Sequence, residues 1–328
     1  MRFALSPEQR DFADSLRKMS DAAGTPGIIR AWGGGDQHGG RGLIRQLAGA
    51  GALGLAIDEA YDGMGAETID SVVAFTEFGR AAVPGPLVET AAAIPALLQA
   101  LPDSVPAGRW LGAFAEGSSL GTLALSPDQP AVDADAAEVI LLVDGDRLYT
   151  ARRTASIRSV DRARRLFSVS PDELLAEGDS VRAAAATAFD AGVLATAAVL
   201  LGAGRALLDT SVAYVKQRHQ FGKPIGQYQA IKHHLANALI GLEMAQPLLY
   251  RAALEPNSRD ISAAKIACAD AAYRTARIAL QVHGAIGYTA EFDLSLWLAK
   301  VTALQSAWGT VDFHRSRVAA ALRDPDAA

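Results

Sequence analysis

The string RHQFGKPI, residues 218–225, separates two long apolar runs of this 328-residue sequence. The run before it, from Ala191 to Arg218, has the periodicity of a helix, and the run after it extends from Tyr228 to about Ala253. A second string, QVHGAIGY at residues 281–288, ends a third helical run. The two strings therefore occupy turns between neighbouring helices of a bundle.

The residue types in both strings suit a phosphate-bearing ligand. Arg218 ends a long helix, and its planar guanidinium can grip a pyrophosphate with two hydrogen bonds. Gln229 opens the next helix with an amide that can hold a polar group. Gly284 and Gly287 let the backbone approach a ligand closely. Taken alone, however, such a turn is more often only a helix stop with a surface charge.

Helices dominate the rest of the chain. Ser6 and Pro7 predict a helix start, and this helix should end near Ala23, where glycine and proline follow. The glycine-rich residues 33–40 predict a flexible loop, because the Gly-Lys-Ser/Thr of a phosphate loop is absent. Further helices are expected over residues 42–51, 68–82 and 87–101.

A small β insert is expected between about residues 112 and 179. Residues 120–125, 139–143, 147–150 and 166–169 read as short strands, and Asp144-Gly145 is a hairpin turn signal. The arginines from 152 to 165 are expected in a loop or at a sheet edge. Helices return over residues 191–218, 228–253, 262–283 and 294–322, with an interruption near Gly309. The predicted fold is mostly α, with an N-terminal helical domain (1–111), a reduced β domain (112–179) and a C-terminal four-helix bundle (180–328).

Composition narrows the class of protein. Half the residues are hydrophobic, aromatics are 6%, and the formal net charge is −5, which argues against a nucleic-acid binder. The single cysteine, Cys268, excludes a disulfide within the chain and is expected to be a buried thiol. No signal peptide and no membrane-spanning stretch is recognised. A cytoplasmic protein that does not enter membranes is expected.

Together with Glu77-Phe78-Gly79-Arg80, the two strings resemble the acyl-CoA dehydrogenase family. The resemblance spans almost the whole chain and is weakest across the β insert. It implies FAD as the cofactor, with the matching residues holding the adenosine and pyrophosphate half of an FAD whose flavin lies in a neighbouring subunit. The residues given this role are Arg218, Gln220, Phe221, Gln229, Gln281, Gly284 and Ala285, with help from His219.

The sequence departs from the family where chemistry is done. The reaction needs a carboxylate base, which the family places before a Gly-Thr pair, and here Trp308 precedes Gly309-Thr310. The family's other base position falls at Gly192-Val193, which is also inert. Asp190 is the nearest carboxylate, and a helix cap or first-turn acid is the more common role for such a residue. The β insert lacks the aromatic and hydroxyl contacts that the family makes to the flavin ring.

These losses resemble the smaller, non-catalytic subunit of heteromeric acyl-CoA dehydrogenases of steroid side-chain degradation. The resemblance implies a full-length catalytic partner in an α2β2 assembly, which would bind most of the acyl-CoA. No catalytic residue and no metal ligand is expected in this chain. Two alternatives stay open: a self-sufficient dehydrogenase that uses Asp190 or another carboxylate, and an architectural homologue that binds neither FAD nor CoA.

Three further features are ambiguous in the sequence. His283 could contact the cofactor or pack at its helix end. His233 and His234 point to different faces of a helix and do not make a metal pair. The arginine cluster at residues 152–165 is expected to be a solvated loop, or else to bind CoA phosphates or an acidic partner.

Overall fold

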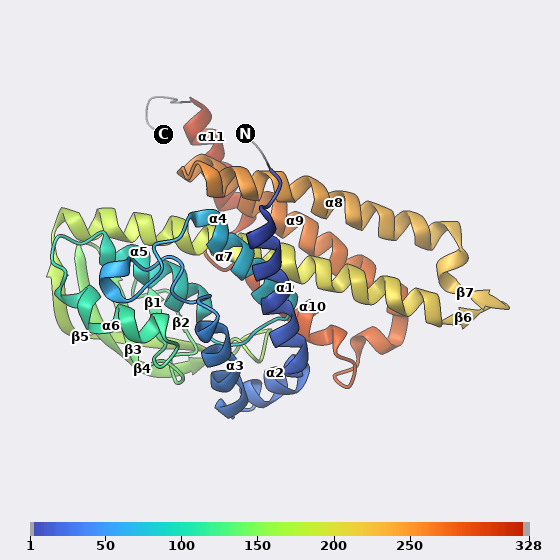
Figure 1. Cartoon of the computed structure of the whole chain (residues 1–328), viewed down its shortest axis with the longest axis horizontal. Coiled ribbons are helices and arrows are strands. Elements are labelled where there is room, and N and C mark those ends of the chain that lie inside the picture. The colour runs from blue at the N-terminus through green and yellow to red at the C-terminus, as the bar shows by residue number, and fades with distance from the viewer. Residues whose placement is uncertain (1–2, 324–328) are drawn as a thin grey trace.

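A computed structural model describes residues 3–323 of the chain. Helices make up most of it, with a small sheet at one end and a long bundle that ends in a hairpin at the other (Figure 1). The predicted class, mostly α with a reduced sheet, is confirmed. The predicted domain boundaries stay a prediction.

The N-terminal part is a set of short helices. They are α1 (Pro7–Ala22), α2 (Thr25–Gly33), α3 (His38–Gly49), α4 (Thr68–Arg80), α5 (Ile94–Gln99) and α6 (Val105–Ala115), with the 3-10 turn η1 (Glu59–Tyr61) and the π turn η2 (Glu89–Ala93). Ser6 caps α1 as predicted: its hydroxyl accepts from the Gln9 amide, and the Gln9 side chain accepts from the Ser6 amide.

The inter-helix loop expected over residues 33–40 is shorter than predicted, and the helix before it was not predicted. Thr25 and Pro26 start a new helix, α2, rather than prolong the break after α1. α2 ends at Gly33, and α3 already begins at His38. The glycines make room for a side chain: a Cβ on Gly40 would lie 2.3 Å from the indole of Trp32, which is fully buried. At Gly40 the absence of a side chain allows close packing on an aromatic ring.

The helix expected over residues 87–101 is divided, and α6 was not predicted. The π turn η2 precedes α5, and Pro106 lies in the first turn of α6, a position that tolerates proline. Proline at 102 and 106 therefore marks a helix end and a helix start within a few residues.

The sheet has the strand order β1-β3-β4-β5-β2. Its strands are β1 (Gly121–Ala124), β2 (Ala131–Val132), β3 (Val139–Asp144), β4 (Arg147–Ile157) and β5 (Leu166–Glu177). β1 and β3 are parallel, and the other pairs are antiparallel. Asp144 pairs with Arg147 across the predicted turn, with Gly145 in the left-handed region. β4 and β5 are longer than predicted, so Arg152 and Arg153 lie in a strand and not in the loop.

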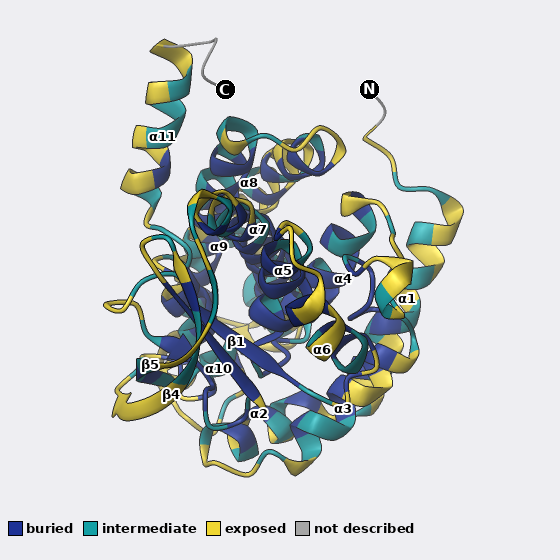
Figure 2. Ribbon diagram, turned by 90° about the vertical axis from the view of Figure 1, so that its left-hand side faces the viewer, coloured by how far each residue is buried: buried dark blue, intermediate teal, exposed yellow. Residues whose placement is uncertain are grey.

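The C-terminal half is a bundle of α7 (Asp179–Gln217), α8 (Gln229–Leu254), α9 (Ser258–His283), α10 (Leu294–Leu304) and α11 (Val311–Arg323). The interruption expected near Gly309 is present between α10 and α11. α7 is long and apolar enough to cross a membrane by length and hydropathy, but 83% of that apolar window is buried by the rest of the protein. Figure 2 shows α7 as a buried helix in the middle of the molecule.

Glycines let α4 approach α7 closely. A Cβ on Gly79 would lie 2.0 Å from the carbonyl oxygen of Val199, and one on Gly202 would lie 1.8 Å from that of Thr76. The neighbouring Glu77 is buried and receives two hydrogen bonds from Arg17, at 2.8 and 3.0 Å. The Glu77–Arg80 segment that suggested the family thus lies in a contact between the N-terminal helices and the bundle.

Candidate functional site

The first string forms an exposed arm at the far end of the bundle from the sheet (Figure 1). Arg218 caps the C-terminus of α7, and the chain then makes a small hairpin of β6 (His219–Gln220) and β7 (Lys223–Pro224). Phe221 and Gly222 form its tip, both with positive φ, at 52° and 83°. The 3-10 turn η3 (Ile225–Gln227) then leads into α8, which begins at Gln229 as predicted.

Aromatic packing brings the second string beside the first. Tyr214, on the last turn of α7, stacks on His283 at the end of α9, with ring centroids 4.2 Å apart. Phe292 closes the cluster at 5.3 Å from the imidazole. Gly284 caps α9 at φ 63°, and Ala285 lies in the following 3-10 turn η4 (Gly284–Tyr288). The two motifs therefore lie at the same end of the bundle, as the family resemblance requires.

His283 is a packing residue. Its ring is buried, and its Nδ1 donates to the carbonyl oxygen of Ala279 at 2.8 Å. Burial lowers the pKa of His283, so the imidazole is neutral at physiological pH. Of the two roles left open by the sequence, the structure favours packing at the helix end over direct contact with a ligand.

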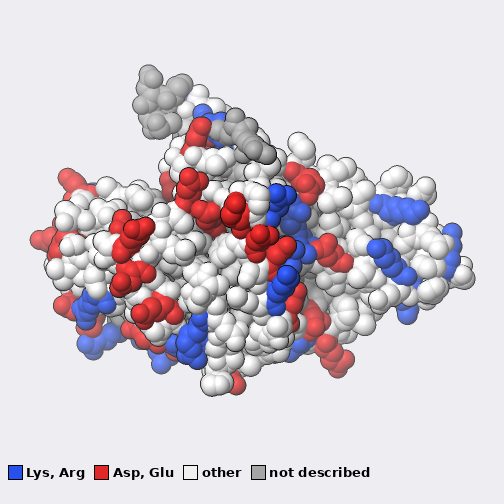
Figure 3. All heavy atoms as spheres, in the orientation of Figure 1, with Lys and Arg blue, Asp and Glu red and all other residues white. Residues whose placement is uncertain are grey.

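The arm is chemically suited to an anionic ligand. Arg218, Gln229 and Gln281 are all exposed, and no ion pair involves Arg218 within residues 3–323. Phe221 is 92% exposed, which is unusual for a large apolar side chain. Basic side chains gather at this end of the molecule, the right-hand end in Figure 3. The backbone carbonyl of Gln220 is already occupied, because it accepts from the Tyr228 hydroxyl at 3.2 Å.

The two positions that correspond to the family's base adjoin each other, because the Trp308 side chain packs against α7 at Gly192. A Cβ on Gly192 would lie 2.5 Å from the Trp308 indole, so the ring rests directly on α7 where that helix has no side chain. Trp308 itself has the left-handed φ of 56°, which is rare for a residue with a bulky side chain. Neither position carries a group that can accept a proton.

Buried polar groups hold the Trp308 loop in place. The imidazole Nε2 of His314 donates to the Trp308 carbonyl oxygen at 2.8 Å, and its Nδ1 is 3.2 Å from the hydroxyl of Ser262. Lys265 is fully buried and donates to the carbonyl oxygen of Leu304 at 3.0 Å. Desolvation lowers the pKa of His314 to about 4 and that of Lys265 to about 8. Buried hydrogen bonds therefore fix the conformation of the Trp308 loop.

Asp190 belongs to a structural contact. Its carboxylate pairs with Arg317 at 2.9 Å and accepts a hydrogen bond from the Ser258 hydroxyl, which ties α7 to α9 and α11. It does not line the cavity beside Trp308. This geometry supports an anchoring role rather than that of a base.

Glu89 is a carboxylate near Trp308 that the sequence analysis missed. It is buried in the π turn η2 and lines a cavity of about 50 Å³ together with Thr196, Lys300 and Trp308. Burial raises the pKa of Glu89, and the charge of Arg164 partly opposes this shift. A lone acid within the apolar run LVETAAAIPALL was the available signal. A cavity of this volume is too small for the three fused rings of a flavin.

The segments that match the family's flavin-contacting strands are used within the sheet. Leu123 and Ala124 are buried in β1, and residues 144–147 form the β3–β4 hairpin. Within the described residues, no group of three or more His, Cys, Asp or Glu side chains could hold a metal ion. Cys268 is buried as predicted, and burial raises the pKa of its thiol to about 12.

Comparison with known proteins places these features in a family. Residues 6–118 match the family model of the acyl-CoA dehydrogenase N-terminal domain, and residues 182–323 match that of its C-terminal domain. The two ranges flank the sheet.

Two relatives are both called acyl-CoA dehydrogenase IpdE2. The protein of Mycobacterium tuberculosis is 31% identical over 303 residues, which cover 90% of this chain and 91% of the relative. That of Mycolicibacterium smegmatis is 34% identical over 255 residues, which cover 76% and 78%.

Solved structures share the fold. Butyryl-CoA dehydrogenase from Megasphaera elsdenii superposes with a TM-score of 0.86 at 21% identity, covering 98% of this chain and 100% of that one. A chain of the ChsE4-ChsE5 complex from Mycobacterium tuberculosis superposes with a TM-score of 0.85 at 21% identity, covering 99% of this chain and 99% of that one. This chain belongs to the acyl-CoA dehydrogenase family.

Proposed function

We propose that this chain is the non-catalytic subunit of a heteromeric, FAD-dependent acyl-CoA dehydrogenase. The partner would be a full-length catalytic subunit, in an α2β2 assembly in the cytoplasm, and it would bind most of the acyl-CoA. When bound, FAD would accept hydride from the β-carbon of the acyl group while a carboxylate of the partner takes the α-proton.

The observation that carries this proposal is the contrast between the arm and the base positions. Trp308 and Gly192 fill the space where the family places its base, and the neighbouring cavity of about 50 Å³ excludes a flavin. The arm is exposed, and Arg218 lies roughly 39 Å along the α7 axis from Gly192. With the arm this far from the base positions, it would serve a flavin held by another subunit.

Within this assembly each arm residue has a defined task. Arg218 would bind the pyrophosphate through its guanidinium, and Gln229 and Gln281 would hydrogen-bond the adenosine half. Gly284 and Ala285 would let the backbone come close to the ligand. Phe221 and Gln220, at the hairpin, would insert into the partner, which accounts for the exposure of the phenyl ring.

The surface of α8 supports a protein partner. Ile240, Met244 and Leu248 repeat every four residues along one face and are 58%, 69% and 44% exposed. An apolar stripe of this kind is characteristic of a surface that another protein covers. One of the similar structures is a two-component complex, ChsE4-ChsE5.

The acyl group is proposed to be steroid-derived. This rests on a structural neighbour described as a steroid acyl-CoA dehydrogenase, Tcur3481-Tcur3483, which superposes with a TM-score of 0.84 at 22% identity. In such a complex the substrate specificity would reside mainly in the catalytic subunit.

The test is the FAD content of the complex. The chain would be co-expressed with a full-length acyl-CoA dehydrogenase encoded beside it, as wild type, Arg218→Gln and Gln281→Ala. We expect each variant to weaken FAD retention by roughly tenfold or more, because a charge-assisted or amide hydrogen bond to the cofactor is lost. Arg274→Gln, which removes an exposed charge from α9, is the matched control and should retain FAD. Full FAD content in both arm variants would instead support a purely architectural homologue.

The self-sufficient alternative has its own test. Turnover by the chain alone that disappears in Asp190→Asn with FAD retained would establish it. The pairing of Asp190 with Arg317 predicts that this variant affects stability and not turnover.

A further inference from the structure

The arm consists of two parts that are distant along the chain. Arg218 follows α7, and Gly284 and Ala285 follow α9, with the whole of α8 between them. α8 leads away from this end of the bundle, and α9 returns to it (Figure 1). Side-chain contacts at this end therefore set the spacing of the two parts. A ligand that touches both parts binds well only if that spacing is fixed.

Tyr214 joins the two parts of the arm. Its backbone carbonyl oxygen accepts a hydrogen bond from the Arg218 amide at 2.9 Å. Its ring stacks on the His283 imidazole with an interplanar angle of 25°, and its hydroxyl donates to the His283 carbonyl oxygen at 3.5 Å. Because His283 directly precedes Gly284, the side chain of Tyr214 fixes the end of α9 relative to Arg218.

Phe292 contacts both of these rings. Its centroid lies 5.3 Å from that of His283 and 6.4 Å from that of Tyr214, and its contact with Tyr214 is edge-to-face. The imidazole Nδ1 is bound to the Ala279 carbonyl oxygen, and its Nε2 is buried without a hydrogen-bond partner among the described residues. The orientation of His283 therefore depends on two aromatic rings and one hydrogen bond.

Arg30 of α2 fixes the segment that carries Phe292. Its Nη2 lies 2.7 Å from the Asp293 carboxylate and donates to the carbonyl oxygens of Ala290 and Glu291 at 3.3 and 3.4 Å. An exposed ion pair alone contributes little, but here the same guanidinium also binds the backbone. Arg30 thus contacts the residues on both sides of Phe292 and restrains the position of its ring.

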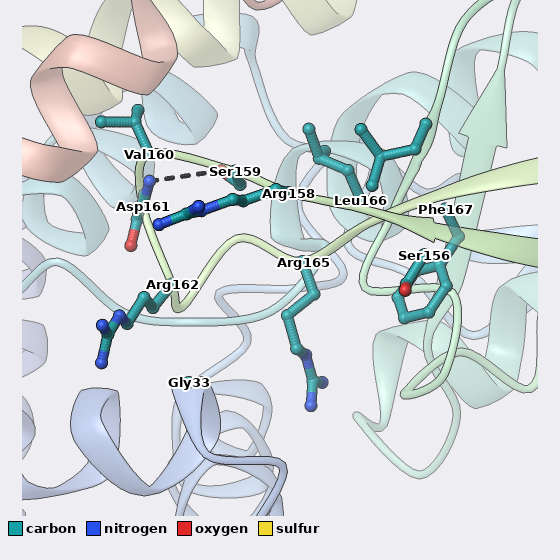
Figure 4. A pocket seen from close by; sticks show the side chains of 11 residues that line it. Gly33, Ser156, Arg158, Ser159, Val160, Asp161, Arg162, Arg165, Leu166 and Phe167 are labelled. Carbon is teal, nitrogen blue, oxygen red and sulfur yellow. Dashed lines mark hydrogen bonds between the residues drawn. The ribbon is translucent and has the colours of Figure 1, made fainter.

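The sheet and its loops in turn fix α2. Trp32, two residues after Arg30, is fully buried, and its indole N–H donates to the Asp133 carboxylate at 3.1 Å. Gly33 ends α2 against the loop after β4, where a Cβ would lie 3.3 Å from the Arg162 backbone. Figure 4 shows Gly33 opposite this loop. A continuous series of contacts therefore leads from the sheet through α2 to the arm.

We propose that Arg30 and Tyr214 are positioning residues for the FAD-binding arm. They act through other residues and set the spacing between Arg218 and the backbone of Gly284 and Ala285. The inference rests on the function proposed above, in which the arm holds the FAD of a partner subunit. It adds that α2 and the sheet, which are distant from the arm in the sequence, contribute to the affinity for FAD.

FAD titration of the complex with the full-length partner, after removal of its FAD, tests the proposal. We expect Tyr214→Leu to raise the FAD dissociation constant roughly three- to tenfold, since an aromatic pair is lost, and Arg30→Gln to raise it roughly threefold. Tyr214→Phe keeps the stacked ring and should restore the affinity of the wild type. Phe114→Leu removes buried aromatic packing in α6, beside the sheet, and Arg45→Gln removes an exposed charge from α3. Both are matched controls that should leave the FAD affinity unchanged.

Hydrogen–deuterium exchange of the full chain without FAD gives an independent measurement. Tyr214→Leu and Arg30→Gln should both speed exchange over residues 284–293, because each removes a contact that restrains this segment. The two control variants should exchange there as the wild type does. Unchanged exchange over residues 284–293 in both test variants would overturn the proposal.

The variant Arg218→Gln separates this inference from the function on which it rests. If Arg218→Gln lowers the FAD affinity while Tyr214→Leu and Arg30→Gln do not, the inference is wrong and the proposed function stands. If Arg218→Gln leaves the affinity unchanged, the proposed function fails and the inference fails with it. An equal loss in Phe114→Leu would assign the effect to general destabilisation and would also overturn the inference. Should Tyr214→Leu not fold, Arg30→Gln, which changes an exposed side chain, decides the question.

Discussion

The substitution Gly192→Ala measures directly whether the Trp308 indole fills the family's base positions. The added Cβ would lie 2.5–2.6 Å from three carbon atoms of the indole, which is closer than two carbon atoms can approach. Overpacking of this kind costs about 1–3 kcal/mol, whereas alanine in place of glycine inside a helix gains up to ~1 kcal/mol. We therefore expect Gly192→Ala to lower the free energy of unfolding by up to about 2 kcal/mol.

A double-mutant cycle isolates the contact. In a Trp308→Ala background the obstruction is gone, so Gly192→Ala should stabilise by up to ~1 kcal/mol, and the coupling between the two sites should be about 1–3 kcal/mol. Urea unfolding followed by far-UV circular dichroism gives these values without depending on tryptophan emission. Gly42→Ala in α3, where a Cβ meets nothing within 4 Å, is the control for helix propensity. Equal stabilisation by Gly192→Ala in both backgrounds would refute the assignment of this space to Trp308.

Three other perturbations test the packing of the N-terminal helices and of the Trp308 loop. Gly202→Ala places a Cβ 1.8 Å from the Thr76 carbonyl oxygen. We expect the free energy of unfolding to fall by about 3 kcal/mol or more, which a lower melting temperature would show. An unchanged melting temperature would contradict the close crossing of α4 and α7. Arg17→Leu leaves the buried Glu77 carboxylate without its partner and should cost about 1–3 kcal/mol in urea unfolding, while no loss would mean that water replaces the arginine. Burial lowers the pKa of His314 from 6.5 to about 4, so the unfolded state binds a proton first as the pH falls. The neutral ring thus contributes up to ~3 kcal/mol of stability, which is present above pH ~6.5 and is lost toward pH 4. The variant His314→Gln should therefore show a smaller change in the free energy of unfolding over this pH range. An equal change in the variant would mean that His314 is not the cause of the pH dependence.

The bundle was predictable because its signals are local and periodic. The turn after α7, the end of α9 at His283 and the start of α8 at Gln229 all lie where the strings place them. α2 was not predicted because proline can start a helix as well as end one, and glycine can serve close packing as well as a turn. Pro26 starts a helix, and Gly40 makes room for Trp32, which lies eight residues away in sequence and is recognisable as its partner only in three dimensions.

The sequence was enough to predict which residues occupy the candidate site, but not which of them contact one another. The sequence identifies Trp308 and Gly192 as inert, but their direct contact depends on how α7 meets the loop after α10. Glu89 escaped notice because a single acid in an apolar helix has no partner within its own sequence window. The role of Asp190 likewise rests on Arg317, more than a hundred residues away.

The most direct test of the central claim is flavin binding by the chain expressed alone and together with its full-length partner. The account predicts a chain that is colourless and without dehydrogenase activity by itself, and a complex that retains FAD and oxidises an acyl-CoA. A yellow, active homo-oligomer formed by this chain alone would contradict it.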